Sequence, residues 1–387
     1  MDTVPPLRRA DAMTADALIV GGGLAGGALA TALAEAGRSV LLLEREAGPH
    51  DKVCGEFLSR EAILYLNALG VDPLALGACH IHSVRLSAGT GVATVKLPFP
   101  ALSLSRRALD EALLRRAADA GADVRLGARV RLLDCGPDAW RAQLSAGESV
   151  EGRSAFLATG KHDLRGRPRP DGQQRDLIGF KMHLRLSPGE AAQLAGHVEL
   201  TLFRGGYAGL EPVEGGLANL CLLVRRGRYA ALRQNWAALL EAMRADSALL
   251  AERLEGAQPC WDRPLAISSI PYGYVRKTGD GVWRLGDQAA VIPSFAGDGM
   301  SIALHSARLA AGYYMSGASA AAYQRQMARD VGTAVRCATL LSQASVHGLG
   351  RILIGWGTSR LPNIMSSVAA LSRVPAGALR RAGLVLV

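Results

Sequence analysis

Lysine is scarce in this sequence of 387 residues, and arginine supplies nearly all of the basic side chains. Lysine stands at positions 52, 96, 161, 181 and 277, and the net charge is +10. The basic residues are scattered, with no lysine-rich run and no recognisable nucleic-acid module, so we expect no nucleic-acid partner. The charge instead favours anionic ligands or contact with the face of a membrane.

The six cysteines form no C-x-x-C pair, and the first 15 residues lack the apolar core of a signal peptide. No uncharged apolar run reaches the length of a membrane-spanning helix. These absences predict a cytoplasmic protein in a reducing compartment, with peripheral contact to a membrane left open. Apolar residues make up 49% of the chain and charged residues 20%, which indicates a folded protein.

A strand, a glycine turn, a helix and a second strand follow one another near the start of the chain. The apolar run Asp16–Val20 leads into Gly21-Gly-Gly-Leu-Ala-Gly26 and a helix that extends to Ala36. Val40–Leu43 reads as the next strand, and it ends on Glu44. This order is the context in which Gly-x-Gly-x-x-Gly indicates dinucleotide binding. A glycine turn without a ligand is the alternative, and the strands and acid in register argue against it.

Each glycine of this turn has a physical role. Gly21 permits the tight turn, Gly23 lets the backbone approach a pyrophosphate, and Gly26 lets the helix pack against the strand. The helix start offers unpaired N–H groups and partial positive charge to the phosphates. The Glu44 carboxylate can accept hydrogen bonds from the adenosine ribose. The neighbouring residues expected in the same site are Leu24, Ala25 and Arg45.

Further elements are expected from hydrophobic periodicity and turn residues. A hairpin is indicated by strands 81–86 and 92–97, and Ser105 is expected to cap a helix over 106–120. The remaining expected elements are strands at 123–126, 130–133, 140–144, 154–160, 177–186, 198–203, 217–224 and 265–274, a helix at 229–243, a strand at 282–287, and helices at 299–314 and 320–346.

Four stretches together resemble the FAD-dependent oxidoreductases of the para-hydroxybenzoate hydroxylase type. They are the glycine turn with Glu44, Arg106-Arg-Ala-Leu-Asp110, Leu157-Ala-Thr-Gly160, and Arg284-Leu-Gly-Asp287 followed by Pro293-Ser-Phe-Ala-Gly-Asp-Gly299. The resemblance implies that Arg106 contacts the FAD, that Asp287 holds the ribityl chain, and that the second helix start lies beside the flavin ring. The other FAD contacts that it implies are Ala158, Thr159, Gly160, Gly286, Gly297, Asp298, Gly299 and Met300.

The segment Lys52-Val-Cys54-Gly55 is similar to one that geranylgeranyl reductases carry near the flavin. Those enzymes reduce isolated double bonds of prenyl chains, so Cys54 is the expected catalytic residue, and Cys54 and Gly55 are expected to contact the flavin. A small core residue is the alternative for Cys54. The substrate motif Tyr-x-Trp-x-Phe-Pro of those enzymes is altered here, because Gly209 and Glu211 replace its tryptophan and phenylalanine. Tyr207 and Pro293 are the expected substrate contacts.

Metal binding has little support in the sequence. His80 and His82 would lie on one face of a strand as half of a site, but no third ligand is evident. We therefore expect no metal.

The predicted fold class is α/β, with a discontinuous Rossmann-type FAD-binding domain, a mainly β substrate domain and a C-terminal helical segment. The predicted FAD-binding domain comprises residues 1–80, 98–165 and 275–330. The substrate domain comprises 81–97 and 166–274, and the helical segment comprises 331–387. Apolar residues of 346–356 beside several arginines suggest that this segment covers an apolar pocket or touches a membrane. An ordinary packed helix with an arginine-rich face is the alternative.

The predicted function is an FAD-dependent oxidoreductase that reduces a double bond of an apolar small molecule, isoprenoid or polyketide-like. Two alternatives stay open: an FAD-dependent monooxygenase that hydroxylates an apolar or aromatic intermediate, and a flavoprotein that carries electrons to a partner. The sequence holds one dinucleotide fingerprint, so NAD(P)H, if it is the donor, must bind without its own Rossmann domain. An electron-donor protein is the other candidate source of electrons.

Overall fold

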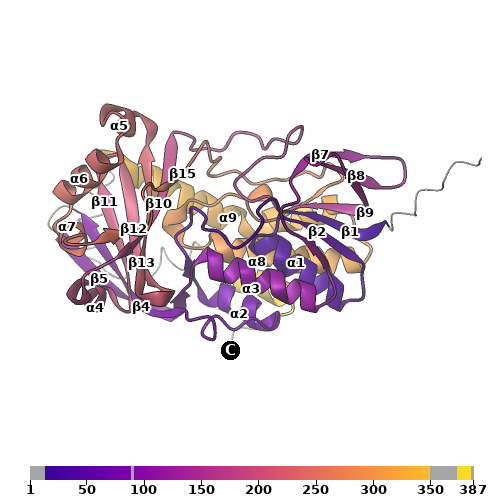
Figure 1. Ribbon diagram of the computed structural model, residues 1–387, viewed down its shortest axis with the longest axis horizontal. Helices are drawn as coiled ribbons and strands as arrows, with labels where there is room; N and C mark the ends of the chain where they lie inside the picture. The colour runs from indigo at the N-terminus through magenta and orange to yellow at the C-terminus, as the bar shows by residue number, and fades with distance from the viewer. Residues whose placement is uncertain (1–13, 89–90, 349–372, 385–387) are drawn as a thin grey trace, which may run out of the picture.

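The computed structural model describes residues 14–88, 91–348 and 373–384. The described chain builds two β-sheets that lie at opposite ends of the molecule, with helices packed below and between them (Figure 1). This arrangement confirms the predicted α/β fold, in which a Rossmann-type domain adjoins a mainly β second sheet. No helix within the described ranges combines the length and apolar character needed to cross a bilayer.

The first sheet carries the predicted dinucleotide motif. Its strands are β1 (Ala15–Val20), β2 (Val40–Leu43), β6 (Asp123–Arg125), β7 (Val130–Cys135), β8 (Trp140–Leu144), β9 (Ser149–Leu157) and β16 (Trp283–Arg284). β1 lies between β2 and β9, and both pair with it in parallel. β6 and β16 extend the parallel part, whereas β7 and β8 form an antiparallel meander on β9. The carboxyl ends of the parallel strands therefore converge on one edge, where ligands bind in such sheets.

Helices cover one face of this sheet. They are α1 (Leu24–Glu35), α2 (Arg60–Ala68), α3 (Arg106–Asp119) and α8 (Gly299–Met315), seen below the sheet in Figure 1. Side chains of β1 alternate as a strand requires: Ile19 packs with these helices, and Leu18 packs on the other face with Trp140 of the meander. Ser105 caps α3 as predicted, because its Oγ accepts the Ala108 N–H at 3.1 Å.

The second sheet is mainly antiparallel. Its strands are β3 (Phe57–Leu58), β4 (Cys79–Ala88), β5 (Gly91–Ser103), β10 (Leu177–Arg185), β11 (His197–Phe203), β12 (Gly206–Val213), β13 (Leu217–Arg225), β14 (Gln258–Pro259) and β15 (Leu265–Ser268). β4 and β5 form the expected hairpin, and β4 pairs in parallel with β11. The hairpin and the later strands thus share one sheet although about 75 residues separate them along the chain.

The outer face of the second sheet is covered by α4 (Pro188–Leu194), α5 (Arg226–Ala231), α6 (Trp236–Asp246) and α7 (Ala248–Arg253). We predicted one continuous helix over 229–243, and this prediction was wrong, because the helix is interrupted between α5 and α6. Arg233 and Gln234 both adopt φ of +53°, which no right-handed helix accommodates. Asn235 then caps α6 by accepting the Ala238 N–H.

The sequence prediction did not include β12. Its Gly206, Gly209 and Pro212 are poor strand formers. The strand forms because β11 and β13 pair with it on both sides, and β13 pairs along its whole length from Gly206 to Val213. Tertiary pairing therefore overrides local propensity at this point, and it turns the altered substrate motif into a regular strand.

Helix α9 (Ala320–Val346) connects the two halves of the molecule. Its 27 residues span about 40 Å and run from the first sheet to the second (Figure 1). The predicted boundary between residues 330 and 331 falls inside this helix. Residues 349–356, in which we predicted an apolar surface, lie outside the described residues. Helix α12 (Ala376–Arg381), described after them, packs into the core of the FAD-binding half through Leu379.

We expect two helical glycines to respond in opposite ways to alanine. A Cβ on Gly26 would lie 1.9 Å from the Gly21 carbonyl oxygen, whereas one on the exposed Gly312 would have no atom within 4 Å. Gly26→Ala should cost about 1–3 kcal/mol of stability or more. Gly312→Ala should stabilise the protein by about 0.5–1 kcal/mol. Urea unfolding measures both, and equal stability of the two variants would contradict the close packing at Gly26.

Candidate functional site

A cavity of about 970 Å³ lies between the two sheets and contacts nearly every predicted site residue. Its lining includes residues of the glycine turn, the Cys54 loop, the start of α8 and the inner face of the second sheet. Of the predicted residues, Gly26, Asp298 and Pro293 do not line it. The predicted residues that do are Gly21, Gly23, Leu24, Ala25, Glu44, Arg45, Cys54, Gly55, Arg106, Ala158, Thr159, Gly160, Tyr207, Gly286, Asp287, Gly297, Gly299 and Met300.

The glycine turn forms a cradle that side chains would fill. Gly21 has a φ of +106°, and a Cβ there would meet the Ala158 carbonyl oxygen at 2.5 Å. A Cβ on Gly23 would lie 3.3 Å from the Arg106 guanidinium and 3.5 Å from the Lys52 ammonium. Two cations therefore flank the start of α1, where the helix already favours an anion.

These cations are anchored by the Asp110 carboxylate. Arg106 donates to both Asp110 oxygens at 2.9 Å, and Lys52 donates at 2.7 Å. Burial opposes ionisation of Asp110, but Arg106 and Lys52 lower its pKa below the usual value. Asp110, at the end of the Arg-x-x-Leu-Asp motif, thus fixes both cations beside the glycine turn.

Glu44 ends β2 and is itself held by the main chain. Its Oε2 accepts the Gly22 N–H at 2.6 Å, and its Oε1 accepts the Glu46 N–H at 3.0 Å. The carboxylate is buried but lines the cavity. The backbone thus fixes Glu44 beside the glycine turn, where the sequence places a ribose contact.

The residues that follow β9 and β16 line the same edge of the cavity. The Gln288 amide donates to the carbonyl oxygens of Gly160 and His162, at 2.9 and 3.0 Å. Arg169 donates to the main-chain oxygen of Asp287 at 2.9 Å. Among the described residues, no hydrogen bond or ion pair engages the Asp287 carboxylate, which lines the cavity. Asp287 is thus available to a ligand.

Asp298 has a different position from its neighbours in the second helix start. Its carboxylate accepts hydrogen bonds from the Val374 N–H at 3.0 Å, from the Arg373 guanidinium at 3.3 Å and from the Ser59 hydroxyl at 3.2 Å. Burial raises the pKa of Asp298 to about 6, although Arg373 opposes the shift. The structure therefore places Asp298 as an anchor for the segment at 373–374, while Gly297, Gly299 and Met300 face the cavity.

The loop 51–56 carries Cys54 and is fastened on several sides. The Cys54 sulfur accepts the Glu56 N–H at 3.4 Å, and its main-chain oxygen accepts from the Asn219 amide at 3.1 Å. Arg106 also interacts with the thiol, and Asp110 and then Cys54 raise the pKa of Arg106 against the effect of burial. Arg106 and Lys52 are both paired with Asp110 on this side of the loop.

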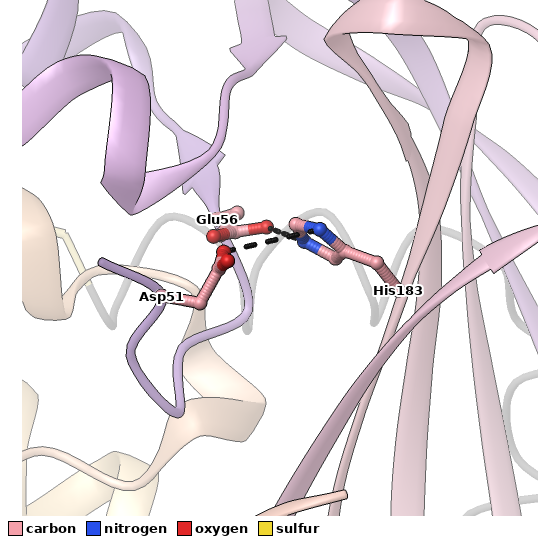
Figure 2. A group of neighbouring side chains, drawn as sticks. All are labelled: Asp51, Glu56 and His183. Carbon is pink, nitrogen blue, oxygen red and sulfur yellow. Dashed lines mark hydrogen bonds and ion pairs between the residues drawn. The ribbon is translucent and has the colours of Figure 1, made fainter. Parts of the chain in front are cut away.

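Figure 2 shows the cluster that fixes the two ends of this loop, in which Asp51 and Glu56 face His183 of β10. His183 Nε2 lies 2.9 Å from Glu56 Oε2. The fully buried Lys181 ammonium contacts Glu56 and lies 3.2 Å from Asp51. Burial opposes its charge, but Glu56 and Asp51 raise the pKa of Lys181 above its usual value.

Asp51, Glu56 and His183 could hold a metal ion by spacing alone. Lys181 already supplies a cation at two of these three residues, so we interpret the group as an ion cluster. His80 and His82 stack with ring centres 5.9 Å apart, and the described residues add no third ligand to them.

Tyr207 links the second sheet to the loop at residues 293–298. Its hydroxyl accepts the Phe295 N–H and lies 3.3 Å from the Ser294 hydroxyl. Burial raises the pKa of Tyr207 to about 12. Pro293, in the same loop, is buried and does not line the cavity.

Sequence reasoning gave no role to Lys181, His183, Glu56, Glu211 or Arg373. One signal for the first two was present: β10 alternates apolar Phe180, Met182 and Leu184 with polar Lys181 and His183. That period of two places both polar side chains on the inner face. No comparable signal exists for Arg373, whose guanidinium lies over the rings of Phe57 and Phe99.

Comparison with known proteins agrees with this geometry. Residues 14–157 match the FAD binding domain family. Menaquinone reductase of Mycolicibacterium smegmatis is 29% identical over 85% of each chain. Digeranylgeranylglycerophospholipid reductase 2 of Methanopyrus kandleri is 31% identical over 77% of this chain and 76% of its own.

This chain belongs to the geranylgeranyl reductase-like branch of the FAD-dependent oxidoreductases. The flavin-dependent brominase Bmp2 shares the fold, with a TM-score of 0.74, 19% identity and 93% coverage of both chains. The predicted family is thereby confirmed, and the protein is an FAD-dependent oxidoreductase.

Asp287→Ala should weaken FAD retention in this oxidoreductase. Loss of a hydrogen bond to a charged group corresponds to about 1.5–3 kcal/mol, or roughly 10- to 100-fold in affinity. FAD released by heating and titrated back into the apoprotein provides the measurement. The exposed Asp138→Ala is the control. Unchanged affinity in Asp287→Ala would show that this carboxylate does not contact the cofactor.

Lys181→Met should destabilise the protein strongly, because it leaves Glu56 charged and buried without its cation. The expected cost is about 3–5 kcal/mol in urea unfolding. Lys277→Met, at an exposed site, should change stability by less than about 0.5 kcal/mol. The double variant Lys181→Met/Glu56→Gln should recover most of the loss. A single variant as stable as the parent protein would refute the ion-pair interpretation.

Proposed function

We propose that this oxidoreductase reduces a carbon–carbon double bond in an isoprenoid-containing substrate of the menaquinone class. The supporting observation is the continuity of the cavity, which runs from the glycine cradle to an apolar wall on the second sheet. That wall includes Val84, Leu86, Val198, Leu200, Leu223 and Ile267. An apolar wall beyond the FAD cradle suits a hydrophobic substrate and favours an enzyme over a simple electron carrier.

The residues of the cradle fit FAD. Gly21 and Gly23 leave room for a pyrophosphate beside Arg106 and Lys52, and Glu44 would accept from the ribose. The Asp287 carboxylate would bind the ribityl chain. The start of α8 at Gly299 would face the flavin ring and stabilise negative charge there. When bound and reduced, FAD supplies the hydride for the reduction.

Cys54 is the proposed catalytic residue. Its thiol lines the cavity on a loop that Glu56, Asn219 and Lys181 hold in place. There it would give or position the proton that adds to one alkene carbon while the hydride adds to the other. The double bond is then saturated, and water returns the proton to the site. The rigid loop supplies the orientation that such a transfer requires.

The function is tested with chemically reduced protein and menaquinone under strict anaerobiosis. We expect a product heavier by a pair of hydrogens, detected by mass spectrometry. Conversion in air alone, with labelled oxygen in the product, would replace the reductase by a monooxygenase. Absence of any product under both conditions would reject this substrate class.

Cys54→Ala should retain FAD and its visible spectrum but lose turnover by roughly 10²- to 10⁴-fold, the range for a positioned proton-transfer group. Cys135→Ala removes an exposed thiol and should match the parent protein. Rates of anaerobic product formation give the comparison. A fully active Cys54→Ala would leave the thiol with a packing role.

A further inference from the structure

Glu211 is a buried carboxyl group on an otherwise apolar wall of the cavity. β12 alternates, so Tyr207, Gly209 and Glu211 face the cavity while Ala208 and Leu210 pack under the outer helices. Glu211 is 3% exposed. The neighbouring cavity-lining positions on β13 are Cys221 and Leu223, which offer no charge partner.

One oxygen of the carboxyl group is unsatisfied in the described part of the protein. Glu211 Oε2 is buried there without a hydrogen-bond partner, and so is Asn219 Oδ1 on the paired strand. The Asn219 amide nitrogen donates instead to the Cys54 main chain. Lys181 lies nearby, but its ammonium is engaged by Glu56 and Asp51. A buried polar atom without a partner is costly, which makes a ligand contact favourable.

The surroundings favour the neutral form of Glu211. Burial, and then the nearby Glu56 and Cys54, raise the pKa of Glu211 well above its ordinary value. The Asn219 amide and Lys181 lower the pKa of Glu211 and offset a smaller part of this rise. A neutral carboxyl group has an O–H that can donate a hydrogen bond, as an ionised one cannot.

Gly209 leaves space beside this group. A Cβ built on Gly209 would have its nearest contact at 3.7 Å, from Leu200. The wall beside Glu211 is therefore open at Gly209. A substrate ring with an acceptor oxygen would fit against this position and reach the Glu211 carboxyl group.

We infer that Glu211 binds a carbonyl oxygen of the substrate, and that the substrate is a ring compound of the quinone class seated over Gly209. This inference rests on the proposed function and specifies which end of the substrate the second sheet recognises. The Glu211 O–H donates to the carbonyl oxygen, while the apolar wall around it contacts the ring and the attached chain.

The test measures binding to the oxidised FAD-loaded protein, in which no turnover occurs. The probes are a naphthoquinone with a short prenyl chain and the naphthalene hydrocarbon of the same shape without its oxygens. We expect the parent protein to bind the quinone about tenfold more tightly. Glu211→Met should abolish that preference, whereas Glu211→Gln, which keeps a donor, should retain most of it. The exposed Glu255→Met is the control.

Each outcome decides the inference separately from the proposed function. Equal affinity of the parent protein for both probes, or an unchanged quinone preference in Glu211→Met, would overturn it. The FAD content of each variant establishes that the site is folded, and a poorly folded Glu211→Met would be replaced by Glu211→Leu. If the quinone binds preferentially but is never reduced, the role of Glu211 stands and the proposed reaction fails.

Discussion

The contact between Lys181 and Glu56 joins the two halves of this protein at the point where its chemistry is expected. Lys181 belongs to the second sheet and Glu56 to the loop that leaves the FAD-binding half. A buried ion pair of this kind contributes little net stability compared with apolar packing, but separating its members is costly. It therefore acts chiefly as a constraint on geometry, and it holds the Cys54 loop against β10.

Other features follow from that constraint. Because Lys181 holds both ends of the loop, Cys54 lines the cavity while its main-chain oxygen stays hydrogen-bonded to Asn219. The glycine cradle and its cations fix the floor of the same cavity through Asp110. Floor, loop and wall come from different parts of the chain, so the cavity exists only when both halves are assembled.

The parts of this structure that local rules determine were predictable from the sequence. The first strand, the glycine turn and α1 form a continuous stretch, and the cap at Ser105 depends on neighbouring residues. What the sequence could not reveal depends on distant partners. β12 is a strand because of β11 and β13, and the break after α5 depends on backbone angles at Arg233 and Gln234.

The same distinction applies to the site. Gly21, Glu44 and Asp287 belong to motifs with fixed spacing, so their places could be inferred without coordinates. The buried groups Lys181 and Arg373 have no motif of their own, and the altered substrate motif gave Glu211 no role. Their importance appears once β10, β12 and the segment at 373–384 are brought to the cavity. Asp298 shows the limit of motif reasoning, because its carboxylate faces the chain at 373–374 rather than the cavity.

The partners of Asp298 at 373–374 are among the last residues of the site that the ribosome adds. The ribosome makes the glycine turn early and the start of α8 much later, and it makes Arg373 and Val374 later still. Until those two residues emerge, the Asp298 carboxylate beside the cofactor chamber lacks its guanidinium and one main-chain donor. A chain that ends before residue 373 therefore lacks two of the groups that stabilise the Asp298 carboxylate.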